Sequence, residues 1–149
     1  MAASPDNRDD GNGSTSMHGM SSRSDTFHVL ALDYSPEVLN LISDVLAEAG
    51  FRVTTRLLPD ESLESIVSLV PDVILMDYIH GREEHGRDIF AAIKQDPRTA
   101  SLPLILCTGA VPETEDIRNA LEQQGVRVLY KPFDIDDLVC EVRSCLGVV

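Results

Sequence analysis

Four short apolar segments, each closed by a polar residue, constrain the fold of this chain more than any other feature of its sequence. Each segment is too short for a helix and lacks polar alternation, which is typical of a β-strand buried on both faces. Strands of this kind belong to parallel sheets with helices on both sides. The segments are Val29–Asp33, Val73–Asp77, Leu104–Thr108 and Val128–Lys131.

Helical patterns alternate with these strands from Phe27 onward. Ser35 and Pro36 are typical of a helix start, and Gly50 of a helix end. Five βα units therefore predict an α/β fold, a doubly wound five-stranded parallel sheet with five helices. The remaining expected elements are a strand over 51–55, helices over 60–70, 86–94, 112–125 and 134–146, and a last strand over 126–130.

Length and composition predict one soluble domain with an N-terminal extension. Residues 1–25 are rich in Ser, Gly, Asn and Asp without hydrophobic periodicity, so we expect a disordered tail, and residues 26–149 form the folded domain. No apolar run is long enough for a membrane span, and no signal peptide is recognisable, which favours a cytoplasmic protein without membrane partners. Three cysteines without a CxxC pair agree with a reducing compartment.

The charge of the chain argues against nucleic acid as a partner. Its formal net charge is −13, from 25 acidic and 12 basic residues. Binding to phosphate backbones requires a basic face, and none is visible in the sequence. A cation or a protein with a basic surface is the better prediction.

The polar ends of the strands predict a site for a cation and a phosphoryl group. The carboxyl ends of parallel strands line one crevice, so residues far apart in sequence should meet there. Asp77 is the candidate nucleophile, Asp33 a candidate Mg²⁺ ligand, and Thr108 and Lys131 offer a hydroxyl and an ammonium group.

Each candidate also has a simpler interpretation. Asp77 or Asp33 could cap a helix or lie on the surface, Thr108 suits any strand, and Lys131 could be solvated. The group formed by all four at strand ends favours the functional interpretation. A transition-metal site built from His80, His85 and a glutamate is a weaker alternative, because charged loop residues are usually just solvated. Cys107 ends a buried strand, so we expect it to be a packing residue rather than a reactive thiol.

The chain resembles the receiver domains of two-component response regulators over about residues 27–147. The resemblance is carried by Leu32-Asp33 with Pro36-Glu37, by the segment from Pro71 to Asp77, by Cys107-Thr108-Gly109 and by Lys131-Pro132-Phe133. It implies a stand-alone receiver with a flavodoxin-like fold, as in chemotaxis regulators, and strand order 2-1-3-4-5.

The resemblance also implies a function and a ligand set. A histidine kinase or phosphotransfer protein would pass a phosphoryl group to Asp77 with the help of Mg²⁺. The metal ligands would be Asp33, Asp77 and the backbone carbonyl of Ile79, while Thr108 and Lys131 would contact the phosphoryl group. The domain would then switch its binding to a downstream protein and would not be an enzyme in its own right.

Several residues depart from the family pattern. Tyr34 stands where a second acidic residue is usual, so we expect weak Mg²⁺ binding. Val128 replaces a frequent aromatic residue of the last strand. Ile79 and Ala110, which correspond to positions that control water access, predict a phosphoryl group that forms slowly and persists.

Two other functions remain open at this point. The first is a degenerate receiver that binds a partner without being phosphorylated, and Tyr34 is its main support. The second is a small phosphatase or hydrolase that uses Asp77. It is disfavoured because Ile79 lies two residues beyond Asp77 and no second general acid is near in sequence.

Overall fold

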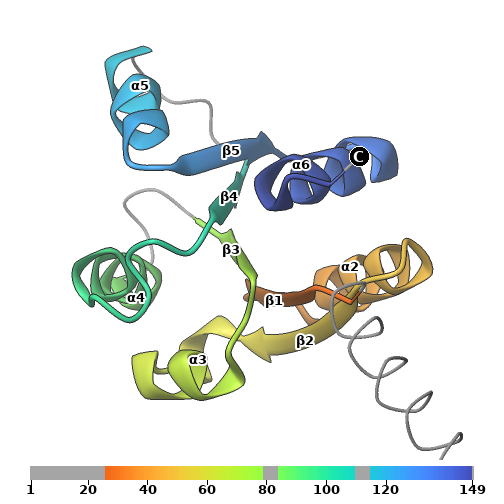
Figure 1. Cartoon of the computed structure of the whole chain (residues 1–149), viewed down its shortest axis with the longest axis horizontal. Helices are drawn as coiled ribbons and strands as arrows, with labels where there is room; N and C mark the ends of the chain where they lie inside the picture. The colour runs from red at the N-terminus through yellow and green to blue at the C-terminus, as the bar shows by residue number, and fades with distance from the viewer. Residues whose placement is uncertain (1–25, 79–83, 110–114, 149) are drawn as a thin grey trace, which may run out of the picture.

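The computed structural model describes residues 26–78, 84–109 and 115–148, and strands alternate with helices throughout (Figure 1). The strands are β1 (His28–Asp33), β2 (Arg52–Leu57), β3 (Val73–Asp77), β4 (Leu104–Thr108) and β5 (Val126–Tyr130). The helices are α2 (Pro36–Glu48), α3 (Leu63–Leu69), α4 (Glu84–Gln95), α5 (Glu115–Gln123) and α6 (Ile135–Leu146), and η1 (Leu58–Asp60) is a short 3₁₀ helix.

The five strands form one parallel sheet in the order β2-β1-β3-β4-β5. Helices α2 and α6 cover one face, and α3, α4 and α5 lie on the other (Figure 1). The predicted doubly wound α/β fold and its strand order are therefore confirmed. None of the helices in the described part of the chain combines the length and hydrophobicity that a membrane span requires.

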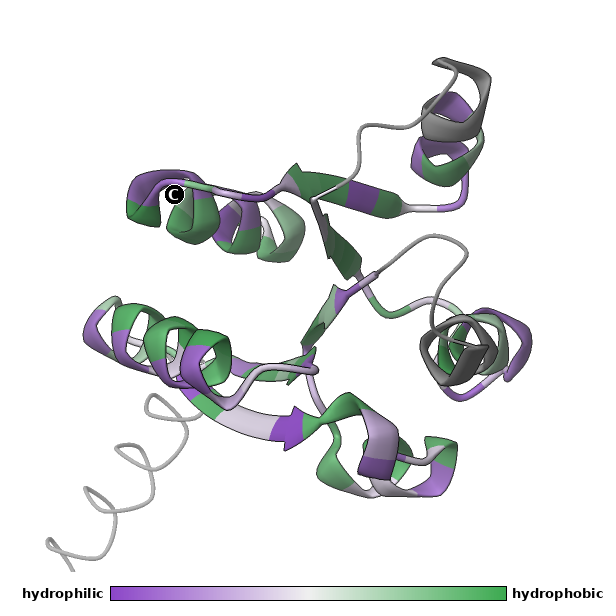
Figure 2. Ribbon diagram, turned by 180° about the vertical axis from the view of Figure 1, so that it is seen from behind, coloured by the Kyte–Doolittle hydropathy of each residue, from purple (hydrophilic) through white to green (hydrophobic). Residues whose placement is uncertain are grey.

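Alternate residues of the central strands supply two separate apolar cores. The α2/α6 cluster takes Val29 and Ala31 of β1, and the α3/α4 cluster takes Leu30 and Leu32. The same alternation continues in β3 and β4, because successive side chains of a strand point to opposite faces. Figure 2 shows that β3 and β4 are hydrophobic over most of their length, whereas every helix also carries hydrophilic residues. The side of the sheet to which a residue points can thus be read from its position in the strand.

Several element boundaries differ from the predicted ones by one to three residues, and α4, for example, begins at Glu84 rather than at residue 86. The helix expected from residue 60 begins only at Leu63, because Ser62 is its N-cap and accepts a hydrogen bond from the Ser65 N–H at 3.3 Å. Residues 58–60 form η1 instead, and Glu61, which lies between η1 and the N-cap Ser62, has an extended backbone. Strand β2 reaches Leu57, two residues beyond the predicted end. The predicted start of the helix at residue 112 lies outside the described residues.

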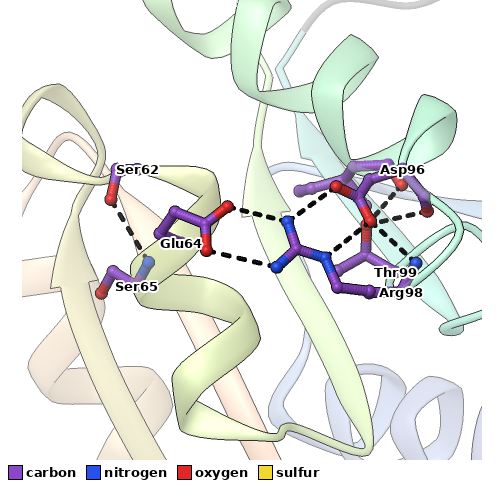
Figure 3. Close-up of polar contacts among 7 residues, drawn as sticks. Ser62, Glu64, Ser65, Asp96, Arg98 and Thr99 are labelled. Carbon is purple, nitrogen blue, oxygen red and sulfur yellow. Dashed lines mark hydrogen bonds and ion pairs between the residues drawn. The ribbon is translucent and has the colours of Figure 1, made fainter.

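An ion-pair cluster joins α3 to the segment after α4 (Figure 3). Arg98 donates to both carboxylate oxygens of Glu64, at 3.2 and 2.7 Å, and its Nη2 lies 2.9 Å from Asp96 Oδ2. The Arg98 backbone N–H also donates to Asp96 Oδ1 at 2.8 Å. The cluster is largely exposed and lies outside the group of polar strand ends.

Candidate functional site

The carboxyl edge of the sheet brings together the four polar residues that the sequence singled out. Asp33 follows Leu32, which is paired with Met76, so that Asp33 lies beside Asp77. On the other side, β4 and β5 pair up to Thr108 and Tyr130, and Lys131 follows directly. The parallel register therefore aligns the strand ends across four neighbouring strands.

Both carboxylates emerge on the same face of the sheet. Asp33 lies two residues beyond Ala31, and Asp77 two beyond Leu75, which are both members of the α2/α6 cluster. Leu129, two residues before Lys131, belongs to the same cluster. The strand alternation thus directs these three charged residues to the α2/α6 side.

A single ammonium group bridges the two carboxylates. Lys131 Nζ lies 3.0 Å from Asp77 Oδ1 and 3.1 Å from Asp33 Oδ2. The side chains of Asp33 and Asp77 are only 3% and 6% exposed, whereas that of Lys131 is 26% exposed. The cluster therefore carries one net negative charge when both acids are ionised.

Backbone groups fix this arrangement from both sides. The Ser35 N–H donates to Asp33 Oδ1 at 2.9 Å, so both oxygens of Asp33 are engaged. The Lys131 N–H donates to the Thr108 carbonyl at 2.8 Å and holds the two strand ends together. Sequence analysis missed this role of Ser35, although a helix N-cap two residues after a strand end is a signal for such a contact. Thr108 itself is buried at the same edge.

The surroundings shift the pKa values of two of these groups. Burial raises the pKa of Asp77, and the charge of Asp33 adds to this, while the hydrogen bond from Lys131 opposes it. Burial alone would lower the pKa of Lys131, but its contacts with Asp77 and Asp33 raise it overall. The charged form of Asp77 is thus favoured by Lys131 and by a backbone hydrogen bond from Tyr78, and is disfavoured by burial and by Asp33.

Cys107 is a packing residue, in agreement with the sequence-based expectation. Its side chain is buried in the α2/α6 cluster, and the residue is 1% exposed. Burial raises the pKa of its thiol to about 12, so almost no thiolate is present near neutral pH.

Tyr34 contributes to the core rather than to the carboxylate cluster. It lies one residue beyond the end of β1, and its ring packs against the α3/α4 cluster that contains Leu32. The residue that replaces the usual acid therefore provides apolar contact at this end of β1.

Some predicted site residues lie outside the described part of the chain. These are Ile79, His80 and Ala110, and the side chain of His85 is also not described. Val128 is described, and it lines a cavity of about 540 Å³ beside β5, together with Glu122, Arg127 and Glu141.

The donor set of the cluster fits Mg²⁺. Asp33 and Asp77 present carboxylate oxygens on one face, and Mg²⁺ prefers such oxygen ligands and keeps several waters. In the described ranges, no group of three or more His, Cys, Asp and Glu residues is placed to hold a metal ion. The described residues therefore offer Mg²⁺ two carboxylate ligands, from Asp33 and Asp77, and water would fill the other coordination positions.

The fold and the site together define a class of protein. It is a doubly wound α/β domain with a carboxylate–ammonium cluster at the carboxyl edge of its sheet, between β1 and β3, where strand order reverses. The family model described as the response regulator receiver domain matches residues 29–143. The chain belongs to this family, whose members receive phosphoryl groups from histidine kinases and generally bind Mg²⁺ at the phosphorylation site.

Curated relatives carry this domain within longer proteins. The chain is 27% identical over 118 residues to the DNA-binding dual master transcriptional regulator RpaA of Synechocystis sp., covering 79% of this chain and 48% of RpaA. It is 33% identical over 120 residues to the DNA-binding transcriptional regulator NtrC of Escherichia coli, covering 80% of this chain and 24% of NtrC. The chain thus spans less than half the length of these relatives.

Solved structures show the same fold. The chemotaxis response regulator CheY4 of Vibrio cholerae superposes with a TM-score of 0.68 at 23% identity, over 81% of this chain and 99% of CheY4. A putative response regulator from Chloroflexus aurantiacus gives a TM-score of 0.66 at 25% identity, over 82% of this chain and 98% of that one.

Proposed function

We propose that Asp77 accepts a phosphoryl group from the phosphohistidine of a histidine kinase or phosphotransfer protein, and that this changes the binding of a downstream protein. The observation that carries the proposal is the contact of Lys131 with both Asp77 and Asp33 at the carboxyl edge. Asp77 is the proposed acceptor rather than Asp33, because Asp77 ends the segment Pro71–Asp77 that resembles the acceptor motif of the family, and Asp33 is held at the N-terminus of α2 by the Ser35 N–H.

The chemistry follows from these positions. A carboxylate oxygen of Asp77 attacks phosphorus, an O–P bond forms, and the P–N bond to the donor histidine breaks. Lys131 offsets the negative charge of the phosphoryl oxygens, and we expect the hydroxyl of Thr108, at the end of β4, to donate a hydrogen bond to one of them. Mg²⁺ held by Asp33 and Asp77 would supply further neutralisation of that charge when bound.

The site is linked to the surface through β4 and β5. The backbone N–H of Lys131 donates a hydrogen bond to the Thr108 carbonyl. In the chain, α5 follows β4 and α6 follows β5. A phosphoryl group on Asp77 competes for the ammonium group of Lys131, so the two strand ends change their contacts. The surface formed by α5, β5 and α6 is therefore the region where we expect partner binding to change.

Intact mass after incubation with acetyl phosphate and Mg²⁺ tests the acceptor. The wild type should gain the mass of one phosphoryl group, and Asp77→Asn should gain none. Asp44→Asn is the matched control, because Asp44 is an exposed carboxylate on α2, and it should label like the wild type. Normal labelling of Asp77→Asn would show that the acceptor lies elsewhere.

A degenerate receiver that acts as a phosphorylation-independent interaction module is the second candidate. The observation in its favour is Tyr34, which packs into the α3/α4 cluster where a metal-binding acid is usual. In that case neither the wild type nor Asp77→Asn would gain the mass of a phosphoryl group from acetyl phosphate. The substitution Asp77→Asn would also leave partner binding unchanged. A hydrolase would instead release phosphate from the donor repeatedly without a stable gain in mass.

A further inference from the structure

The outer side of β2 is an open sheet edge on the face of the molecule away from β5. In the described part of the chain β2 pairs only with β1, and it ends the sheet order on that side (Figure 1). Its six residues are exposed or half-buried, and Val53, Thr54 and Thr55 favour extended backbone. An exposed edge of this length presents unpaired main-chain groups that accept a further strand.

Strand β2 carries two arginines on the same face, four residues apart. Arg52 and Arg56 alternate with Thr54 on one face of β2, and Thr54 Oγ1 lies 2.7 Å from His28 Nε2. Four residues of strand separate the two arginines by about 13 Å. Both side chains point to the same face of β2. Residues i and i+4 of an extended partner segment would have the same separation and would also lie on one face.

Among the described residues no carboxylate balances the charges of these two arginines, and the contact of the Arg56 guanidinium is with the Thr55 carbonyl, to which its Nη1 donates at 3.2 Å. Neither Arg52 nor Arg56 forms an ion pair with any residue that the structure describes. By contrast, Arg127 on the opposite edge strand β5 is paired with Glu141 at 3.3 Å. Two cations on an open edge without a carboxylate partner in the described ranges are unexpected in a chain of net charge −13.

This charge pattern disfavours a second copy of the chain as the occupant of the edge and favours an acidic strand. If β2 paired antiparallel with β2 of a second copy, Arg52 would lie opposite Arg56 of the other copy in the centred register. Like charges directly opposite each other destabilise strand pairing, whereas opposite charges stabilise it. The edge therefore disfavours self-association and fits an acidic strand.

We propose that the outer edge of β2 binds an extended acidic segment of a partner protein, with carboxylates four residues apart opposite Arg52 and Arg56. Main-chain hydrogen bonds to β2 provide affinity, and the two arginines select for charge and spacing. This surface is separate from the acceptor site, so the inference does not depend on phosphorylation of Asp77.

The probe is the synthetic peptide Thr-Glu-Val-Thr-Val-Glu-Thr, acetylated and amidated, added to the full chain. We expect slower amide hydrogen exchange at the β2 amides that do not bond to β1. The double variant Arg52→Gln/Arg56→Gln should weaken binding by about 2- to 30-fold, from two cross-strand charge pairs. Arg127→Gln removes a charge from the other edge strand and is the matched control, so it should bind like the wild type.

Two further peptides test charge and spacing. Lysine in place of both glutamates should abolish binding, and a peptide of the same composition with adjacent glutamates should bind as weakly as the double variant does. Equal binding of all peptides, or no protection of β2, overturns the proposal. Protection of β2 without peptide that is lost in Asp6→Asn/Asp10→Asn would assign the edge to the chain's own N-terminal segment and would also overturn it.

Discussion

Asp33 and Asp77 end neighbouring strands on the same face of the sheet, and the one ammonium group of Lys131 contacts both of them. Two buried carboxylates with one cation leave an excess negative charge at this edge. Burial raises the pKa of Asp77, which shows that its charged form is disfavoured by its environment. The structure thus holds a destabilised carboxylate at the position where a phosphoryl group or a metal ion would relieve the excess charge.

The first prediction is that Asp77→Asn stabilises the fold at neutral pH. The variant removes the excess charge and leaves Lys131 paired with Asp33. We expect a gain of about 1 kcal/mol in the free energy of unfolding, on the scale of substitutions that relieve a functional site. Urea denaturation at pH 7 measures it, and Asp44→Asn on the exposed face of α2 should change stability far less.

The pH dependence of this gain follows from the raised pKa of Asp77. A group with a raised pKa in the folded state contributes stability below its unfolded pKa, and this contribution is lost as the pH rises through the folded pKa. At acidic pH the wild-type Asp77 is neutral, so the advantage of Asp77→Asn should shrink. An advantage that stays constant from pH 7 to acidic pH would contradict the role of charge.

The positions of Asp33 and Asp77 were predictable from the sequence, but the contact of both with the ammonium group of Lys131 was not. A buried strand that ends in Asp shows where a carboxylate lies, because parallel strands end at one edge. That Lys131 reaches Asp33 as well as Asp77 depends on side-chain conformation, which has no sequence signal. The packing of Tyr34 on the α3/α4 cluster was not predictable either, because Tyr34 lies beyond the end of β1 and the strand pattern does not fix its side chain.

The second prediction concerns position 34 and Mg²⁺. Tyr34 lies one residue beyond the end of β1, so a short aspartate at this position can turn from the α3/α4 cluster toward Asp33 and Asp77. Tyr34→Asp should therefore tighten Mg²⁺ binding by about 1–3 kcal/mol, the scale of charge-assisted contacts. It should also lower the stability of the metal-free protein, because the ring that packs on the α3/α4 cluster is lost. Tyr34→Phe keeps the ring and adds no charge, so its Mg²⁺ affinity should equal that of the wild type. Calorimetric titration with Mg²⁺ checks both variants, and an unchanged affinity of Tyr34→Asp would mean that position 34 does not face the cation.

The third prediction concerns the lifetime of the phosphorylated protein. It rests on sequence, because Ile79 and Ala110 lie outside the described residues. Neither side chain can bind a water molecule for in-line attack, so the phosphoryl group should persist well beyond seconds. Decay after donor removal measures this, and Ile79→Asn should accelerate it. Loss within seconds in the wild type, or no acceleration in the variant, would contradict the expectation.

The fourth prediction uses the ion-pair cluster of α3 and the segment after α4. Hydrogen bonds from Arg98 lower the pKa of Asp96 to about 2, and Arg98 also lowers that of Glu64 (Figure 3). A lowered pKa contributes stability above the unfolded value, about 3.9 for Asp, and this is lost as the pH falls through the folded value. Because Arg98 and Glu64 are well exposed to solvent, we expect only a small effect.

Acid denaturation of Arg98→Gln tests this cluster. The variant should be slightly less stable than the wild type near neutral pH, and the difference should vanish as the pH falls to about 2. High salt should reduce the difference as well, because exposed pairs are screened. A difference that grows toward low pH would have the wrong sign for these carboxylates.

The last prediction concerns the end of α3, where Val70 adopts the left-handed conformation with φ 49° and ψ 58°. This conformation costs an L-residue about 1–2 kcal/mol, and β-branched side chains tolerate it least. Val70 is 73% exposed, so removal of its side chain costs little packing. Val70→Gly should therefore stabilise the fold by about 0.5–1 kcal/mol after the entropic cost of glycine.

Val67→Gly, inside the same helix, is the control and should destabilise the fold, because glycine there lowers helix propensity and removes partly buried surface. Urea denaturation of both variants separates relief of strain from a general effect of glycine in α3, since only strain at Val70 gives the two substitutions opposite signs.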